Sequence, residues 1–445
     1  MFYRKIVKDL EKWADNKWRK PLILRGARQV GKTTIVRQFA RQYANFLPFN
    51  LEKHADRHLL ESTDEVQKLL PMMFLHCGVP ERQGRTLVFL DEVQNSPKTV
   101  ALLRYFYEEL PDIHVIAAGS LLETMLGRNI SIPVGRVDYL ALRPCSFTEF
   151  MGAMGEERFV PHLLDATLPD VFHEHVNELF NTYALVGGMP EVVARFAESR
   201  NVMDLSATYM SLINSYKNDV EKYATGATRI NVIRHIVERG WNFAGQTITF
   251  GGFAGSQYKA REVGEALRIL EKAMLCELVY PTTSTLPPGI QELRRAPKLI
   301  WLDTGLVNYA AKIQKEYLTS KNLKDVWRGM AAEQMAAQAL LTLDANVDTR
   351  RKFWVREKKG SNAEVDFVYE YEGRLIPIEV KSGHNAHLKS LHSYMDEAPH
   401  GLAVRVWSNP FSIDEVQTPS GKTFKLINLP FYYLEALPKI LDCQE

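Results

Sequence analysis

Short apolar runs alternate with helix-like segments over the first third of the chain. Each run is continuous rather than alternating, as is typical of central strands in a parallel sheet. The predicted strands are 21–25, 46–52, 87–90, 114–118 and 137–144. A helix is predicted from Thr34 to Tyr43, and Ile6, Leu10 and Trp13 follow helical spacing in a first helix. This alternation predicts an α/β fold in which helices cover a parallel sheet.

The pattern changes twice further along the chain. From Ser146 to about Tyr223 it is mostly helical, interrupted at Gly187-Gly188-Met189-Pro190, which predicts a helical lid. Residues 228–315 then show two helices followed by two short strands around a Pro-rich turn, and this order resembles a winged helix-turn-helix. The two strands are predicted at 275–279 and 298–302.

A fourth unit begins near Asp325. It starts with a helix over 327–341 and a short strand over 353–356, followed by a hairpin whose strands are 364–371 and 376–381. The predicted domains are therefore 1–145, 146–227, 228–315 and 316–445. The length of 445 residues alone gives a prior of about three domains.

Basic side chains are concentrated in the winged-helix-like unit. They could contact a nucleic-acid backbone, but glutamates on the same helix dilute the charge, so a solvated face of mixed charge is an equal alternative. The basic residues are Lys259, Arg261, Arg268, Lys272, Arg294, Arg295 and Lys298.

Composition indicates an ordinary globular protein. Apolar residues make up 46% and charged residues 24%, and the net charge of +2 does not by itself indicate nucleic acid as a partner. The four cysteines are dispersed without metal-ligand spacing, which favours a reducing cytoplasm. No apolar run approaches the ~18 residues that cross a bilayer, so no membrane partner is expected.

The segment Gly26 to Thr33, GARQVGKT, matches the phosphate-binding loop Gly-x4-Gly-Lys-Ser/Thr in full. It lies between a predicted strand and a predicted helix, where its backbone N–H groups would point at phosphate oxygens. Lys32 would reach the β and γ phosphates of ATP, and the Thr33 hydroxyl would ligate Mg²⁺. The nucleotide-binding residues are predicted as Gly26, Ala27, Arg28, Gln29, Val30, Gly31, Lys32, Thr33 and Thr34.

Asp91 and Glu92 follow the apolar strand that ends at Leu90. Carboxylates at this end of a strand lie in the crevice where open α/β sheets bind ligands. Asp91 is predicted to hold Mg²⁺ through water, and Glu92 to polarise the attacking water. Ser120, after the strand 114–118, is a candidate sensor of the γ phosphate, although Gly-Ser is also ordinary turn chemistry.

A second group of carboxylates is predicted on the C-terminal hairpin. Glu379 and Lys381 are two apart on one strand and share a face, and Asp366 lies on the neighbouring strand. With Glu333 on the preceding helix, they would form a Mg²⁺ site suited to phosphodiester hydrolysis, in which Glu333, Asp366 and Glu379 bind the metal. The alternative is ordinary cross-strand pairing of charges.

The whole chain resembles a prokaryotic AAA-type, archaeal-ATPase-like family with a C-terminal domain that has a restriction-endonuclease-like PD-(D/E)xK core. The resemblance is carried by LRGARQVGKTT, FLDEVQ, AAGSLL, LRPCSFTEF, GGMPEVV, WLDTGLVNY, EVDF and IEVKSG. It implies nucleotide and Mg²⁺ binding by Lys32 and Thr33, ATP hydrolysis through Asp91 and Glu92, and a nuclease-like site at Asp366, Glu379 and Lys381. The chain departs from the nuclease signature at Val365, where the signature has proline.

In such ATPases an arginine from a neighbouring subunit often completes the site, which implies a homo-oligomer. Arg136 and Arg128 are candidates by position, and either could equally be a surface cation. Two functions stay open. The first is an ATP hydrolase whose nucleotide state moves the winged-helix and nuclease-like domains on DNA, with metal-dependent cleavage. The alternative is a nucleotide-gated switch whose C-terminal domain contacts DNA or protein without cleaving it.

Overall fold

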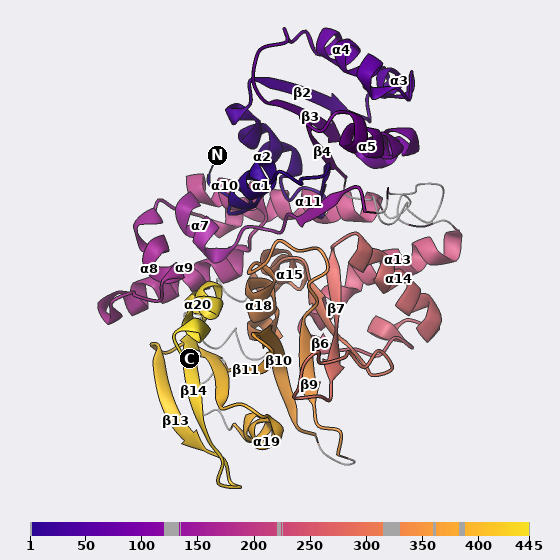
Figure 1. Cartoon of the computed structure of the whole chain (residues 1–445). Helices are drawn as coiled ribbons and strands as arrows, with labels where there is room; N and C mark the ends of the chain where they lie inside the picture. The colour runs from indigo at the N-terminus through magenta and orange to yellow at the C-terminus, as the bar shows by residue number, and fades with distance from the viewer. Residues whose placement is uncertain are drawn as a thin grey trace.

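The N-terminal part of the computed structural model is a five-stranded parallel sheet between two layers of helices (Figure 1). The structure describes residues 2–119, 133, 135–219, 224, 226–314, 330–358, 362–381 and 388–444. The strand order is β2-β3-β4-β1-β5. The strands are β1 Leu22–Arg25, β2 Asn45–Asn50, β3 Thr86–Asp91, β4 His114–Ala118 and β5 Asp138–Ala141. The predicted parallel α/β architecture is confirmed for this part of the chain.

Both faces of this sheet are buried. Successive side chains of a strand point to opposite faces, so each strand contributes to a hydrophobic cluster on either side. Leu22 and Leu24 of β1 join one hydrophobic cluster, whereas Ile23 between them joins the other. The first face packs against α1 Ile6–Asp15 and α2 Lys32–Phe39, and the second against α3 His54–Glu61, α4 Val66–Cys77 and α5 Pro97–Glu109. The continuous apolar runs in the sequence follow from this double burial.

A layer of helices lies below the N-terminal sheet in Figure 1. It contains α7 Phe147–Ala153, α8 Val160–Leu164, α9 His173–Val186, α10 Pro190–Ser199 and α11 Ser206–Asn218. Short 3-10 turns are η1 Ala40–Gln42, η2 Val93–Asn95, η3 Glu157–Phe159, η4 Asp170–Phe172, η5 Val202–Leu205, η6 Gly240–Phe243, η7 Phe253–Gly255 and η8 Phe431–Ala436. None of the helices in the described part of the chain is long and apolar enough to span a bilayer.

The rest of the chain is built on a nine-stranded mixed sheet with the order β13-β14-β12-β11-β10-β9-β7-β8-β6. Its strands are β6 Gln246–Thr247, β7 Cys276–Thr282, β8 Lys298–Trp301, β9 Lys352–Val355, β10 Glu364–Tyr371, β11 Arg374–Val380, β12 Leu402–Trp407, β13 Ser412–Gln417 and β14 Thr423–Pro430. The helices are α13 Ala227–Arg239, α14 Ala260–Lys272, α15 Thr304–Ala310, α18 Met330–Leu341, α19 Lys389–Glu397 and α20 Leu437–Asp442.

This sheet crosses the boundary predicted between the third and fourth units. Strand β7 pairs in parallel with β9, and Tyr280 lies opposite Lys352. The hairpin of β10 and β11 is antiparallel, and β11 pairs in parallel with β12. The sequence pattern gave no sign of the β7–β9 pairing, because each strand has its own apolar face and pairing partners are set by tertiary contacts.

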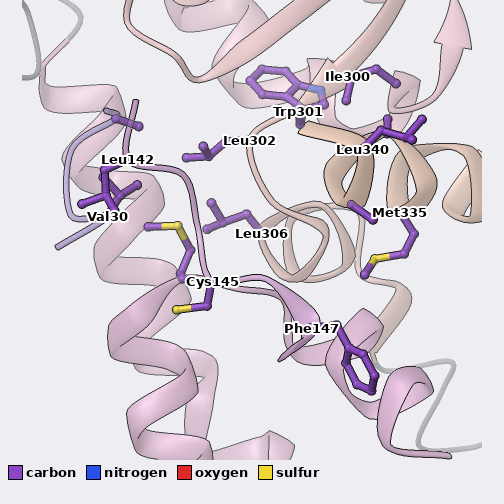
Figure 2. Close-up of a cluster of buried hydrophobic side chains, with 14 of the residues drawn as sticks. Val30, Leu142, Cys145, Phe147, Ile300, Trp301, Leu302, Leu306, Met335 and Leu340 are labelled. Carbon is purple, nitrogen blue, oxygen red and sulfur yellow. The ribbon is translucent and has the colours of Figure 1, made fainter. Parts of the chain in front are cut away.

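One hydrophobic core connects the N-terminal sheet with the later units. Figure 2 shows Val30 and Leu142 close to Cys145 and Leu306, with Met335 of α18 on the other side of the cluster. These side chains come from positions between Val30 and Met335 of the sequence, and all belong to the same buried cluster. The units therefore share packing, and a change in one is felt by the others because interiors are close-packed.

Asp303 fixes the helical layer onto the large sheet. This side chain is fully buried, and it accepts hydrogen bonds from Gly188 N at 2.5 Å and Leu306 N at 3.0 Å. Burial raises its pKa to about 6, although those N–H donors and Gln338 act in the opposite direction. The GGMP and LDTG segments therefore meet at a buried carboxylate that caps α15 and holds the backbone before α10.

Candidate functional site

The glycine-rich loop lies between the end of β1 and the start of α2. Gly31 immediately precedes α2 and has a φ of 95°, a left-handed conformation that favours glycine. Gln29 also has a positive φ of 64°. The loop therefore curls at the N-terminus of α2, where backbone N–H groups and the helix dipole attract anions.

Lys32 is folded back over this loop. Its Nζ donates hydrogen bonds to the carbonyl oxygens of Gly26 and Ala27, both at 2.9 Å. The side chain is buried, and burial lowers its pKa to about 8 although Glu92 and Asp91 favour the charged form. Lys32 is thus a buried cation held at the phosphate-binding loop by carbonyl groups, which a phosphate oxygen can replace.

Thr33 and Asp91 meet at the carboxyl end of the sheet. The Thr33 hydroxyl donates to Asp91 Oδ2 at 2.7 Å, and the other Asp91 oxygen accepts the Glu92 backbone N–H at 3.1 Å. Burial raises the pKa of Asp91, whereas the bond from Thr33 lowers it. A hydroxyl and a carboxylate this close form a donor set suited to Mg²⁺, which prefers oxygen ligands.

Glu92 is held by a residue that the sequence analysis did not identify. Gln94 Nε2 donates to Glu92 Oε2 at 2.5 Å, and Glu92 has a left-handed φ of 54°. Gln94 Oε1 is buried and has no hydrogen-bond partner among the described residues. Gln94 therefore fixes the direction of the Glu92 carboxylate. The only sequence signal for this role is that Gln94 lies two residues after Glu92.

Helix α11 contacts the outer residues of the loop. Arg28 Nη1 pairs with Asp219 Oδ1 at 2.5 Å, just after α11, and the Tyr216 hydroxyl donates to Arg28 O at 3.3 Å. Ser215 Oγ donates to Gln29 Oε1 at 3.1 Å. The helical layer thus contacts the loop through side chains, although these residues carry no motif in the sequence.

Arg136, the remaining nucleotide-site candidate among the described residues, is not brought to this loop. Ser120 and Arg128 lie outside the described residues. Arg136 precedes β5 and pairs with Glu108 of α5 at 2.9 Å. Because β5 is parallel to β1, with Asp138 opposite Leu22, Arg136 lies at the end of the sheet away from the loop. A role for Arg136 at a neighbouring subunit stays a prediction.

The C-terminal hairpin brings its predicted residues together. Lys381 Nζ lies 2.6 Å from Glu379 Oε1, and Asp366 Oδ2 accepts the Val380 backbone N–H at 2.7 Å. Burial, followed by the charge of Asp366, raises the pKa of Glu379 to about 7. Glu379 Oε2 is buried and has no hydrogen-bond partner among the described residues.

Lys298 enters the same cluster from β8. We expected it to be a wing cation on the surface, and this was wrong, because its side chain is only 2% exposed. Its Nζ lies 2.8 Å from Glu333 Oε2, 2.8 Å from Glu364 Oε1 and 3.5 Å from Asp366 Oδ1. The pairing of β8 with β7 turns the Lys298 side chain inward. The sequence pattern placed Lys298 in a wing, and that position gave no sign of its burial.

The cluster does not fit a divalent metal as its side chains are placed. Lys298 lies between the carboxylates of Glu333, Glu364 and Asp366, where a metal would need to bind them. In the described part of the chain, no group of three or more His, Cys, Asp or Glu side chains converges in a way that could hold a metal ion. Burial raises the pKa of Glu333 to about 7, and the charges of Asp366 and Glu364 act in the same direction, whereas Lys298 opposes them.

The other basic residues of the middle unit lie in several different environments. Arg261 pairs with Glu265 at 2.9 Å, whereas Arg268 and Lys272 line a cavity. Arg294 and Arg295 are exposed in the turn between β7 and β8, and Lys259 immediately precedes α14. Only part of the expected basic surface is therefore available to a duplex.

Comparisons with known proteins identify the first unit. Residues 18–151 match the family model of an AAA domain. Residues 177–317 and 328–431 match two models described as domains of unknown function, DUF8612 and DUF4143. No protein of curated function matches the chain.

Two solved structures are similar in parts. One is a Walker-type ATPase of Pyrococcus abyssi with 16% identity and a TM-score of 0.44, and the alignment covers 70% of this chain and 96% of that one. The other is a STAND protein of Pyrococcus horikoshii with a tetratricopeptide-repeat sensor, with 12% identity and a TM-score of 0.30, covering 77% of this chain and 47% of that one.

The AAA match, the parallel sheet and the loop geometry agree with one another. The N-terminal part of the chain is a P-loop ATPase domain of the AAA type. Residues 328–431 match a domain whose function is not known, so the nuclease-like interpretation rests on the hairpin alone.

Proposed function

We propose that the chain binds Mg²⁺-ATP at the loop 26–34 and hydrolyses it. The observation that carries the proposal is the 2.7 Å contact between the Thr33 hydroxyl and Asp91 beside the buried ammonium of Lys32. In this proposal Lys32 binds the β and γ phosphates, and Thr33 and Asp91 hold Mg²⁺, which neutralises charge on the phosphates. Glu92 accepts a proton from the attacking water, and Gln94 orients its carboxylate.

A test of hydrolysis separates binding from chemistry. Lys32→Ala should lose nucleotide binding, and Glu92→Gln should keep binding but lose turnover, measured as phosphate release and fluorescent-nucleotide titration. Glu109→Gln, at an exposed glutamate of α5, is the matched control and should be unchanged. Wild-type turnover in Glu92→Gln would show that another group activates the water.

We further propose that residues 228–315 form a winged-helix domain and that the domain boundaries are those predicted from the sequence. The order α13, β6, η7, α14, β7, β8, with β8 between β6 and β7, supports this proposal. Arg294 and Arg295 are two of its exposed cations and contact DNA in this proposal, whereas Lys298 is excluded by burial. Replacing Arg294 and Arg295 with alanine should weaken duplex binding at every sequence and lower its salt dependence.

For the C-terminal unit we favour the non-cleaving alternative, a contact module moved by the ATPase domain. The arrangement of strands β9 to β12 is compatible with a restriction-endonuclease-like sheet, but the Lys298 ammonium takes the place of a metal among the carboxylates. The wild-type chain should therefore leave plasmid DNA intact with Mg²⁺ or Mn²⁺. Metal-dependent cleavage that Asp366→Asn abolishes would restore the nuclease function instead.

A further inference from the structure

A cavity lies where the ATPase domain, the winged-helix-like unit and the C-terminal unit meet. Its volume is about 210 Å³. Trp301, Ile300 and Leu302 of the shared core, which Figure 2 shows close together, form part of its wall. The wall also carries six basic side chains, which are Arg25 and Arg143 from the ATPase side, Arg268 and Lys272 from α14, and Arg350 and Arg351 before β9.

The charges of this wall do not balance. Six basic side chains line the cavity, and Glu271 and Glu277 are its two acidic residues. Glu277 is committed to Arg351, whose Nε lies 3.1 Å from it, and Glu271 accepts the Leu278 backbone N–H at 3.0 Å. A surplus of positive charge in a partly enclosed space attracts anions, because the field there is less screened than in open water.

Arg143 is the residue that most needs a partner. Its Nε is buried and has no hydrogen-bond partner among the described residues. Burial lowers its pKa to about 10, and Arg351, Arg350 and Arg25 add repulsion that Glu277 only partly offsets. Buried guanidinium groups are normally paired, so an unpartnered N–H in a basic cavity indicates a missing acceptor.

We propose that this cavity binds a small anion that carries phosphate groups. Guanidinium groups bind phosphate oxygens in a bidentate way, and the cavity is also lined by Arg25, by Arg268 and Lys272 of α14, and by Arg350. The cavity volume suits an anion with one or two phosphate groups and is too small for a nucleic-acid duplex. The site is distinct from the loop 26–34 and does not depend on ATP hydrolysis.

The cavity is connected to the nucleotide loop by the backbone of Arg143. Arg4 Nη2 donates to Arg143 O at 2.6 Å, and Arg4 Nη1 donates to Val30 O at 3.3 Å within the loop. Arg25, on the cavity wall, is followed directly by Gly26. An anion that orders Arg25 and Arg143 therefore acts on residues next to the loop.

Calorimetric titration of the full chain with pyrophosphate tests the site. The loop 26–34 also binds phosphates, so the test uses Lys32→Ala, in which saturable binding should remain. Adding Arg268→Gln and Arg350→Gln, at two exposed cavity residues, should weaken that binding by about tenfold or more. The wild-type chain should bind pyrophosphate both at the loop 26–34 and in the cavity. In that chain, Arg268→Gln together with Arg350→Gln should remove one of these two binding events. ADP in place of pyrophosphate distinguishes a nucleotide from an inorganic ligand.

The control changes the same charge outside the cavity. Arg261→Gln, on the same helix, and Arg195→Gln, on α10, are exposed and do not line the cavity. This pair should bind pyrophosphate as the parent does. The proposal is overturned if the Lys32→Ala chain, shown by circular dichroism to be folded, shows no saturable binding. Equal weakening by the control pair and the cavity pair would also overturn it.

Discussion

Lys298 Nζ lies 2.8 Å from Glu333 Oε2 and joins strand β8 to helix α18 across the boundary between two units. Burial alone would lower the pKa of Lys298, but the charges of Glu333, Asp366 and Glu364 outweigh it and raise the pKa. The ammonium also lies 5.0 Å from the centre of the Phe353 ring, a distance suited to a cation–π contact. Lys298 is therefore a permanent cation inside a group of carboxylates.

Removing this cation should destabilise the protein strongly. Lys298→Met keeps the apolar stem but leaves Glu333 and Asp366 without a buried partner, and breaking such a pair costs about 3–5 kcal/mol. Urea unfolding of the full chain measures the loss. Lys68→Met is the matched control, because Lys68 pairs with Glu65 on the surface, where a pair contributes about 0–1 kcal/mol. Equal losses in the two variants would contradict a structural role for Lys298.

The same geometry predicts how the cluster responds to metal. In the wild-type chain, Mn²⁺ should not raise the melting temperature through this cluster, since Lys298 occupies the centre of the carboxylates. Lys298→Ala opens that place, and Mn²⁺ should then raise the melting temperature by mass action. Asp366→Ala in the Lys298→Ala background is the control and should remove the increase. A Mn²⁺-dependent increase in the wild type that Asp366→Ala abolishes would show that the lysine does not exclude metal.

Local patterns predicted the ATPase domain well and the C-terminal cluster only in part. The loop before α2 and the strand before Asp91 are local features, since a few adjacent residues determine them. Lys298 could not be assigned from sequence, because its direction depends on β7 pairing with β8 and β9. Arg143 and Asp303 lie in the segments LRPCSFTEF and WLDTGLVNY, but these segments did not reveal their roles, since their environments are built by segments far apart in the chain. Tertiary contacts decide such cases.

The pKa of Lys32 predicts a pH dependence of ATP binding. Its free-state value of about 8 follows from burial, and contact with phosphate favours the charged form, so the bound-state pKa is higher. Below pH 8 the lysine is protonated in both states and the dissociation constant is flat. Above it, binding takes up a proton, and the dissociation constant rises by up to about tenfold per pH unit.

Fluorescent-nucleotide titration between about pH 6.5 and about pH 9.5 measures this effect. Lys32→Arg is the control, because a guanidinium stays charged over this range and its profile should be flat even if its affinity is lower. A flat wild-type profile, or the same slope in Lys32→Arg, would assign the titration to another group.

Gly188 lies where the helical layer meets the large sheet, and its substitution tests how tightly the two are joined. A Cβ at this position would lie 2.2 Å from the Cys145 carbonyl oxygen, a backbone atom that cannot rotate away. Because Gly188 N also donates to the buried Asp303, the chain cannot shift without losing that bond. Gly188→Ala should therefore cost about 1–3 kcal/mol or more.

Gly401→Ala provides the matched control for this substitution. A Cβ at Gly401 would meet no atom within 4 Å, so the same added methyl group should leave the free energy of unfolding nearly unchanged. Both variants are measured by thermal and urea unfolding, with the ATPase rate as a second readout. Pro190 lies two residues after Gly188, and its ring is close to the nucleotide loop, since a Cβ added at Gly31 would lie 3.7 Å from that ring. Strain at Gly188 should therefore reach the loop through Pro190 and slow ATP turnover. A Gly188→Ala chain as stable as Gly401→Ala would show that the Asp303 contact can move, and that the helical layer is joined to the sheet more loosely than the packing indicates.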